Sequence, residues 1–432
     1  MHDVRAEDAE ERALEADAAV SPQGWAATTF EAFRFPTYRV VWLGSFLGYM
    51  AFTMASTAQA VVAYDLTGNN SAVGAVMFGQ GVAMTFLNPF GGAIADRFSK
   101  RFLILLGQAV IGSVMLTTAI LISFDAISIA YLAFASFLIG SMFSFLGPTR
   151  TAILGEILPG QRIGNAVALF QVGNNFARIA APFFAASLLA WPLVGSSGTY
   201  FVIASLFVLI IATFSQVPGS APRRDRGETS VLEDVRLGVR YLLGHPRLLQ
   251  TVLSFHVIMM LGSASYVLLP AFAKDVLDAG TTGLGVLLGV SAAGGFAMSL
   301  VVASLADSRS APTYLLISSL GGGIALILTG LAPSFAIAIL TMALASGGVS
   351  AFQTLNNAIA LRLTEPDYYG RVIGLVFIAW GFTSLASLPV GYLGDLLGER
   401  AVLSGSGVVL CLFVLLLAVW QRRNGAAAGD AV

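Results

Sequence analysis

Four polar residues within one apolar segment have the spacing of a binding face. Gln171, Asn174, Asn175 and Arg178 stand at positions i, i+3, i+4 and i+7, which places them on one side of an α-helix. An arginine near the centre of a membrane span costs about 2.5–3.5 kcal/mol on insertion scales, so its side chain should face protein or a water-filled cavity. The pattern predicts either a hook for an anionic or carbonyl group of a ligand, or a structural arginine held by backbone carbonyls and these amides.

Other apolar segments contain uncharged polar, thioether and aromatic side chains of the kind that line ligand pockets. Such groups adapt to a bulky, partly apolar ligand. A single phenylalanine or methionine can equally face lipid or pack against a neighbouring helix. The cavity candidates are Phe52, Met54 and Gln59 in the segment 37–64, His256, Met260 and Tyr266 in 247–273, and Gln353, Asn356 and Asn357 in 334–360.

Proton coupling needs a titratable group that both sides of a membrane can reach. No carboxylate stands in the middle of an apolar segment. Histidine is the side chain that titrates closest to physiological pH, and His256 is the deepest one. Asp65, at the end of the segment 37–64, is the second candidate. A packing histidine and a loop-capping aspartate are the plainer alternatives.

Metal, disulfide and phosphate-loop chemistry have little support. Cys411 is the one cysteine, and the three histidines are scattered along the chain, which excludes disulfides, zinc sites and thiol relays. The chain contains no Walker-type phosphate loop. We therefore expect neither an enzyme nor a cofactor or metal, and no use of ATP within this chain.

The elements that position these residues follow from the composition. Of 432 residues, 56% are hydrophobic and 11% charged, whereas a soluble domain has about a quarter charged residues. The apolar runs are continuous and about 20 residues long, as membrane-spanning helices require, and do not alternate as in a β-barrel. The sequence predicts an all-α integral membrane protein with twelve transmembrane helices, at 37–64, 71–95, 102–123, 127–149, 163–190, 198–216, 247–273, 282–305, 312–332, 334–360, 370–394 and 401–420.

One long polar stretch divides these spans into two groups of six. Residues 218–246 form the expected linker, with an amphipathic helix over 231–243. The acidic start of the chain contains no apolar core of a signal peptide and is expected to be a disordered tail. The predicted organisation is a tail over 1–34, six-helix halves over 35–217 and 247–421, and a second tail over 422–432.

The basic residues predict the orientation in the membrane. Nearly all of the 23 lysine and arginine residues fall in the tails, the linker and the loops on the same side, whereas Lys274 and Arg400 fall on the other side. Basic loops stay in the cytoplasm, so both termini should be cytoplasmic, in a plasma (inner) membrane. The net charge of −1 gives no reason to expect a nucleic-acid partner.

The two predicted halves also repeat each other. Gly74 and Gly285 open small-residue-rich segments that end, at the same distance along the chain, in Asp96 and Asp307. Such duplication is typical of transporters, in which two pseudo-symmetric halves rock about a site between them.

A family resemblance rests on the loop between the second and third spans. Residues 92–101 read Gly-Ala-Ile-Ala-Asp-Arg-Phe-Ser-Lys-Arg, which resembles the signature loop of the major facilitator superfamily, with Ser99 at the place of a frequent glycine. The second half has a degraded copy of this loop at Leu305-Ala-Asp307-Ser-Arg309. Further motifs resemble the branch of enterobactin exporters and related multidrug antiporters. They are Gly147-Pro-Thr-Arg150, Asn165-Ala166, Tyr241-Leu-Leu-Gly-His-Pro246 and Tyr369-Gly-Arg371-Val-Ile-Gly374.

The resemblance implies that this loop latches the two halves together on the cytoplasmic side. Asp96 ends a helix, where the helix dipole disfavours a carboxylate, so it should seek a partner elsewhere. The alternative for the basic residues is a topology anchor only. The implied latch residues are Gly92, Asp96, Arg97, Lys100, Arg101, Asp307 and Arg309.

The resemblance also implies a central cavity lined by the first, fourth, seventh and tenth spans, which would bring the cavity candidates together. Antiporters of the superfamily usually bend the fifth span at Gly-Pro followed by Gly-Gly. This chain has Ala181-Pro182 followed by Phe183 and Phe184. That departure keeps a facilitator or importer as an alternative to antiport.

Together these features predict a monomeric secondary transporter. It would export small amphipathic molecules, drug-like or siderophore-like, by alternating access in exchange for protons. A facilitator or importer with the same fold and a non-transporting receptor are the alternatives.

Overall fold

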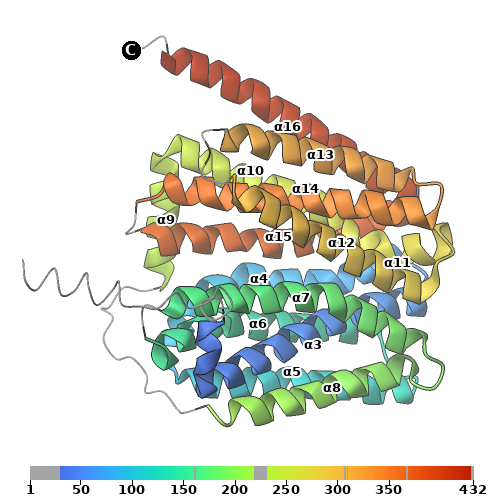
Figure 1. Ribbon diagram of the computed structural model, residues 1–432. Helices are drawn as coiled ribbons and strands as arrows, with labels where there is room; N and C mark the ends of the chain where they lie inside the picture. Colours follow the sequence, from blue (N-terminus) through green and yellow to red (C-terminus); the bar gives the residue numbers. More distant parts are fainter. Residues whose placement is uncertain are drawn as a thin grey trace, which may run out of the picture.

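The computed structural model describes residues 30–159, 162–217, 231–305, 308, 310–365 and 368–429, which are helical and contain no strand. The two ends of the chain and most of the predicted linker, including 1–29 and 218–230, lie outside the described residues, as do Asp307 and Arg309. The long helices are drawn in Figure 1. Their bounds are α3 (Pro36–Thr67), α4 (Asn70–Arg97), α5 (Lys100–Ser123), α6 (Ile129–Ile157), α7 (Ile163–Ala190), α8 (Gly195–Phe214), α9 (Val231–Gly244), α10 (Pro246–Ser263), α12 (Gly280–Ala303), α13 (Ala311–Gly330), α14 (Phe335–Arg362), α15 (Tyr369–Leu397) and α16 (Glu399–Gly429).

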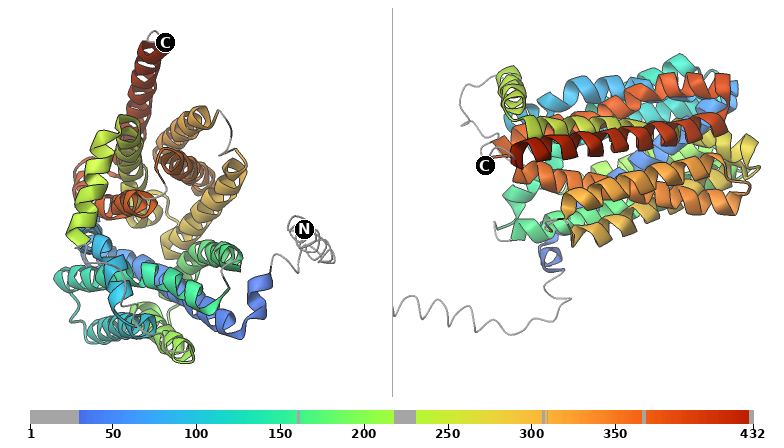
Figure 2. Two further views of the ribbon diagram at one scale, coloured as in Figure 1. Left: turned by 90° about the vertical axis from the view of Figure 1, so that its left-hand side faces the viewer. Right: turned by 90° about the horizontal axis from the view of Figure 1, so that it is seen from above.

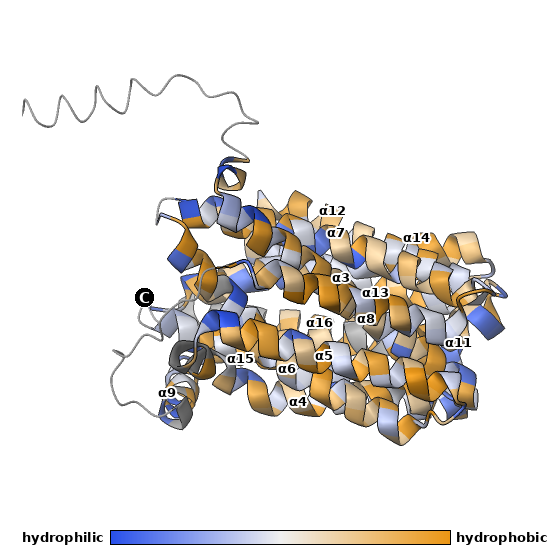
Figure 3. Ribbon diagram, turned by 90° about the horizontal axis from the view of Figure 1, so that it is seen from below, coloured by the Kyte–Doolittle hydropathy of each residue, from blue (hydrophilic) through white to orange (hydrophobic). Residues whose placement is uncertain are grey.

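The predicted all-α membrane fold is confirmed. Within the described residues, 11 helical segments are long and apolar enough to cross a membrane. The twelfth predicted span is α7, whose 28 residues reach about 42 Å at 1.5 Å per residue. Its polar face over 171–178 lowers its hydropathy. Hydrophobic residues cover the length of the helices, and hydrophilic ones gather at the two ends (Figure 3).

The helices form two bundles that lie side by side (Figures 1 and 2). We call α3–α8 the first bundle and α10–α16 the second bundle. The amphipathic helix expected at 231–243 is α9, which packs on α15 and also contacts α10 and α4. We call the end of the molecule where α9 lies the α9 end, and the opposite end, where α3 turns into α4 at Gly68, the far end.

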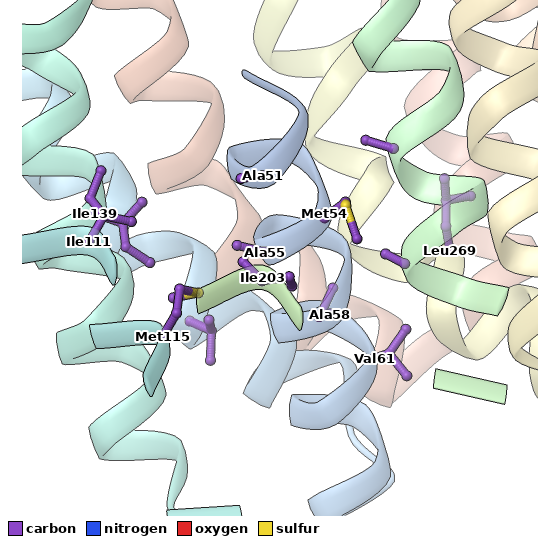
Figure 4. Close-up of a cluster of buried hydrophobic side chains, with 14 of the residues drawn as sticks. Ala51, Met54, Ala55, Ala58, Val61, Ile111, Met115, Ile139, Ile203 and Leu269 are labelled. Carbon is purple, nitrogen blue, oxygen red and sulfur yellow. The ribbon is translucent and has the colours of Figure 1, made fainter. Parts of the chain in front are cut away.

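Small residues place α3 in the middle of the first bundle. Ala51, Ala55 and Ala58 are fully or almost fully buried, and Figure 4 shows them among side chains of the surrounding helices. Small side chains let helices approach closely, which is the main source of helix–helix packing energy in lipid. Met54, which the sequence assigned to the cavity, is buried in this core.

The seventh span is not one continuous α-helix as predicted. After α10 the chain forms a 3₁₀ segment η3 (Ala264–Leu268), the short α11 (Leu269–Ala271) and a π segment η4 (Phe272–Val276). Pro270 cannot donate a hydrogen bond to the carbonyl of Tyr266, and its ring crowds that carbonyl. The proline therefore accounts for the break, and Tyr266 and Pro270 on either side of it line the space between the bundles.

An ion pair ties α5 to α6 at the α9 end. Lys100, at the start of α5, is buried and pairs with Glu156 in the last turn of α6, whose side chain is 29% exposed. Removing Glu156 leaves the buried charge of Lys100 without its partner, which costs about 3 kcal/mol.

We expect Glu156→Gln to lower the thermal stability of the detergent-purified protein by this order. Glu156→Gln with Lys100→Met should be less destabilised than Glu156→Gln alone, because no unpaired buried charge remains. Arg240→Gln removes an exposed basic residue of α9 and should change stability by less than about 0.5 kcal/mol; an equal loss in Arg240→Gln would contradict a buried charge that depends on Glu156.

Candidate binding cavity

A cavity of about 260 Å³ lies between the two bundles. Both bundles contribute to its wall, and most of the lining is apolar or aromatic. The lining residues are Tyr49, Phe52, Thr53, Ser56, Thr57 and Ala60 from α3, Met77 from α4, Arg178 and Pro182 from α7, Tyr266, Leu269 and Pro270 from the broken seventh span, Leu284, Leu288 and Ala292 from α12, Ser346 from α14, and Trp380 from α15.

Arg178 is the one charged side chain in this wall. It is exposed, and it forms no hydrogen bond or ion pair with any other residue that the structure describes. Pro182 follows one turn later on the same helix face and also lines the cavity. An unpaired guanidinium in an apolar cavity can bind an anionic or carbonyl group strongly, because hydrogen bonds to charged groups are stronger there than in water.

Two more predicted cavity residues, Phe52 and Tyr266, also line the space. Phe52 stacks on Phe143 of α6, with ring centroids 4.1 Å apart, which fixes one aromatic wall. Tyr266 donates a hydrogen bond to Ser346 Oγ at 3.3 Å. This bond holds the broken seventh span against α14.

The remaining candidates lie outside this lining. Gln59 is buried between α3 and α6, where Ser136 Oγ donates to its Oε1 at 2.9 Å. His256 Nδ1 donates to the carbonyl of Val252 at 2.7 Å, and its ring packs 5.7 Å from that of Phe382 on α15. The others outside the lining are Met54, Asn174, Asn175, Met260, Gln353, Asn356 and Asn357.

Sequence reasoning missed several lining residues. Trp380 and Tyr49 stand in apolar runs without a distinctive pattern, so nothing in the sequence selected them. Thr53, Ser56 and Thr57 did carry a signal, since their spacing of i, i+3 and i+4 marks one face of an apolar helix. Their hydroxyls donate to backbone carbonyls one turn back in α3, which leaves their oxygens able to accept from a ligand.

Glycines bring α4 and α15 into backbone contact across the two bundles. A Cβ on Gly81 would stand 2.6 Å from the backbone nitrogen of Leu385, and one on Gly381 would stand 2.7 Å from that of Thr85. Gly391 meets the backbone of Asn70 in the same way near the far end. No larger residue fits these positions while the two helices stay in contact, so this α4–α15 seam is built on glycine.

A second seam joins α7 to α12. A Cβ on Gly285 would stand 3.0 Å from the carbonyl oxygen of Pro182, and one on Gly289 would stand 2.8 Å from that of Ile179. Toward the α9 end, large side chains next to the two seams are exposed. Phe176 precedes Ile179 by three residues and is 62% exposed, and Phe377 precedes Gly381 by four and is 54% exposed. The glycine contacts of both seams therefore give way to exposed aromatic side chains toward the α9 end.

Polar contacts between the bundles add to the closure at the far end. Asp65, at the end of α3, forms an ion pair with Lys274, and Tyr64 donates a hydrogen bond to the carboxylate of Asp275. The two contacts join adjacent residues of one bundle to adjacent residues of the other. They close the space above the cavity where α3 meets the end of the seventh span.

Asp395 caps the start of α4 from the other bundle. The N–H groups of Asn70 and Ser71 donate to its two carboxylate oxygens at 2.6 and 3.0 Å, and Asn70 Nδ2 donates to Glu399 at 2.8 Å. The first N–H groups of a helix have no partner within the helix, and the positive end of the helix dipole favours a carboxylate. Asp395 therefore stabilises the closed far end.

We expect Asp395→Asn to loosen this end. Loss of a helix cap costs about 1 kcal/mol, so transient opening should become about fivefold more frequent. With cysteine at Ser71 in a Cys411→Ala background, a membrane-impermeant thiol reagent should label the Asp395→Asn variant several-fold faster. Asp125→Asn removes an exposed carboxylate at the same end and should leave the labelling rate unchanged. Equal rates in all three proteins would contradict a cap that holds the bundles together.

The structure places only part of the predicted latch. Lys100 pairs with Glu156, and Arg101 donates to the carbonyl of Ser215 at the end of α8, so both contact their own bundle. Gly92 lies within α4, whereas the side chains of Asp96 and Arg97 lie outside the described part of the chain, together with Asp307 and Arg309. The latch role of these residues stays a prediction.

Comparisons with known proteins agree with this architecture. The model of the Major Facilitator Superfamily matches residues 41–387. The enterobactin exporters EntS of Shigella boydii serotype 18 and Escherichia coli O81 are each 26% identical to this chain over 397 residues, which is 90% of this chain and 93% of each exporter.

Solved structures share the fold at lower sequence identity. A mutant of the nucleoside transporter NupG superposes with a TM-score of 0.73 at 14% identity, covering 88% of this chain and 99% of that one. A bacterial homologue of the human lysosomal transporter Spinster gives 0.71 at 14% identity, covering 89% and 96%. Since the family model spans every residue that lines the cavity and most of the two bundles, the chain belongs to the Major Facilitator Superfamily of membrane transporters.

Proposed function

We propose that this protein is a monomeric secondary transporter of the inner membrane that exports small amphipathic molecules by alternating access in exchange for protons. The observation that carries the proposal is the cavity between the bundles, because both bundles line it and polar contacts between them close the far end. Such a cavity can open to one side of a membrane and then to the other when the bundles rock against each other.

The proposed orientation puts the α9 end in the cytoplasm. Basic side chains gather there, including Lys100, Arg101 and Arg162, and the positive-inside rule places such an end in the cytoplasm. Both termini and α9 then lie in the cytoplasm. With this orientation, the polar contacts of the far end would close the cavity on the outer side, and the substrate of an exporter would enter from the cytoplasm.

The cavity wall supports an amphipathic substrate with aromatic character. Tyr49, Phe52, Tyr266 and Trp380 offer ring surfaces, and Arg178 offers one unpaired positive charge. A ligand with an aromatic or apolar body and one anionic or carbonyl group would satisfy both features. The 26% identity to enterobactin exporters supports export, of siderophore-like or drug-like molecules.

For proton coupling we propose Asp65. It forms a cross-bundle ion pair with Lys274 and is about half exposed at the far end, so a proton from outside can reach it. Protonation would remove the negative charge and weaken the closure. The second candidate, His256, lies between α10 and α15 and can act only if these helices separate.

The proposal is tested in inside-out vesicles with an imposed proton gradient. Accumulation of a lipophilic cation dye should exceed that of protein-free vesicles, should collapse with an uncoupler, and should fall in Asp65→Asn. Asp125→Asn provides a matched exposed control. If Asp65→Asn retains full gradient-driven uptake, Asp65 does not couple protons. If no member of a dye and siderophore panel accumulates with folded protein, export is refuted.

A facilitator or importer is the second candidate, and one observation favours it. Within the described chain, no acidic side chain lines the cavity, so substrate and proton do not meet there. A facilitator would equilibrate the same probes down their own gradient at a rate that an uncoupler leaves unchanged.

A further inference from the structure

A group of buried polar side chains lacks partners inside the first bundle. Arg150 on α6 is 8% exposed, Gln108 on α5 is 0% exposed and Ser45 on α3 is 1% exposed. Arg150 Nε, both amide atoms of Gln108 and Ser45 Oγ are buried and have no hydrogen-bond partner among the described residues. Buried polar groups are nearly always paired in folded proteins, so three together call for a common explanation.

Gly48 shows that two of these groups meet at one place. A Cβ on Gly48 would stand 2.5 Å from Nη2 of Arg150 and 3.6 Å from Nε2 of Gln108. The space beside the glycine is therefore used by the guanidinium, with the amide next to it. Ser45 precedes Gly48 by three residues and lies on the same face of α3. Three helices thus turn hydrogen-bond donors toward one region.

Burying the charge of Arg150 without a counter-ion destabilises the folded protein. Its guanidinium forms no ion pair with any residue that the structure describes, although the ion pairs of Lys100, Arg162 and Lys274 are all formed. A lone buried charge costs several kcal/mol, and a low-dielectric interior makes a counter-ion correspondingly effective. Arginine stays protonated in such a site, so it cannot escape the cost by losing its proton.

We propose that Arg150, Gln108 and Ser45 form a site for one small monovalent inorganic anion such as chloride, separate from the substrate cavity. The single positive charge matches one negative charge, and the guanidinium, amide and hydroxyl can all donate to it. The almost complete burial of the three residues excludes a bulky organic ligand.

The site adjoins the substrate cavity through one aromatic layer. Tyr49 lines the cavity and follows Gly48 directly, and its ring packs 6.3 Å from that of Phe143. Phe143 lies two turns before Arg150 on α6. An anion bound there would fix the positions of α3, α5 and α6 behind the wall formed by Tyr49, Phe52 and Phe143.

The test compares the thermal stability of the full-length detergent-purified protein in chloride, bromide and gluconate at constant ionic strength. An anion at 100 times its Kd raises the stability of the native state by RT ln 101, so the melting temperature should be at least about 2 °C higher in chloride or bromide than in gluconate. This difference should vanish in Arg150→Gln. That variant should also be more stable than the wild type in gluconate, because the uncompensated charge is gone.

Two further variants locate the effect. Gly48→Ala displaces the guanidinium and should weaken the halide effect, whereas Arg178→Gln, the matched change in the substrate cavity, should retain it. A halide effect that disappears in Arg178→Gln and survives in Arg150→Gln would place the anion in the cavity and overturn the proposal. Equal melting temperatures of the wild type in halide and gluconate would overturn it as well. Neither result bears on export, which the vesicle assay measures separately.

Discussion

Replacing Gly81 with leucine is expected to abolish transport while leaving the protein folded. The Cβ alone would stand 2.6 Å from a backbone nitrogen and 2.8 Å from a backbone carbonyl carbon of α15. Backbone atoms cannot turn aside as a side chain can, so α4 and α15 must separate beside the cavity, where Met77 and Trp380 line it. A change of about 5.5 kcal/mol in the free-energy difference between two conformations is enough to turn a 99:1 population into 1:99. We expect the four carbons of a leucine side chain, placed between two backbones, to destabilise the closed conformation by this order. We expect transport to fall by more than tenfold.

A matched variant and a labelling experiment test whether leucine at position 81 holds α4 and α15 apart. Gly321→Leu adds the same side chain on α13, where a Cβ meets nothing within 4 Å, and should transport normally. In a Cys411→Ala background, cysteine at Ser71 should react faster with an impermeant reagent when Gly81 is leucine, because the far end stays open. Normal transport in Gly81→Leu would show that this seam need not close during the cycle.

The second large effect is expected at Arg178. Its guanidinium lines the cavity without a partner in the described chain, and a hydrogen bond to a charged group contributes about 1.5–3 kcal/mol. Arg178→Ala should therefore weaken the binding of an anionic aromatic probe by about tenfold or more. Binding of a lipophilic cation dye should stay the same or improve, since a repulsive charge is removed. Fluorescence anisotropy of the two probes with purified protein measures both constants.

Arg178→Lys separates charge from geometry in this prediction. Lysine keeps the positive charge but not the planar array of donors, so it should restore part of the lost affinity. Equal losses for the anionic and the cationic probe would indicate that the arginine shapes the cavity instead of binding the ligand. Aggregation of Arg178→Ala in detergent would favour the structural alternative.

The number and positions of the membrane-spanning helices were predictable because the thickness of the bilayer sets the length of an apolar run. The predicted spans differ from the observed helices mainly at their ends, and α9 begins at Val231 as the amphipathic pattern indicated. Long apolar runs and polar breaks depend on local sequence only, so they need no knowledge of how helices pack.

The cavity was harder to predict, since its members depend on helix rotation and tilt. Gln59 was a reasonable candidate, yet its amide turns to Ser136 inside the first bundle. The fourth span, which the resemblance placed in the cavity, contributes no residue to the lining, whereas α12 and α15 do. Rotation of a helix by one residue changes the face it presents, and packing between helices decides this rotation.

The break in the seventh span could have been read from the sequence. Pro270 stands within the predicted helix, and proline disrupts the preceding turn. The glycines of the two seams also had a readable signal, because small residues spaced along apolar helices favour close contact. The sequence could not predict which helix each glycine contacts, because these contacts depend on the arrangement of the two bundles.

One measurement tests alternating access between the bundles most directly. Asn70 and Glu399, whose side chains meet across the two bundles at the far end, are replaced by cysteine in a Cys411→Ala background and joined by a short bifunctional thiol reagent that reductant can cleave. We predict that substrate movement stops when the far end is cross-linked and returns after reduction, while either single cysteine variant is unaffected by the reagent. Undiminished transport by the fully cross-linked protein would contradict it.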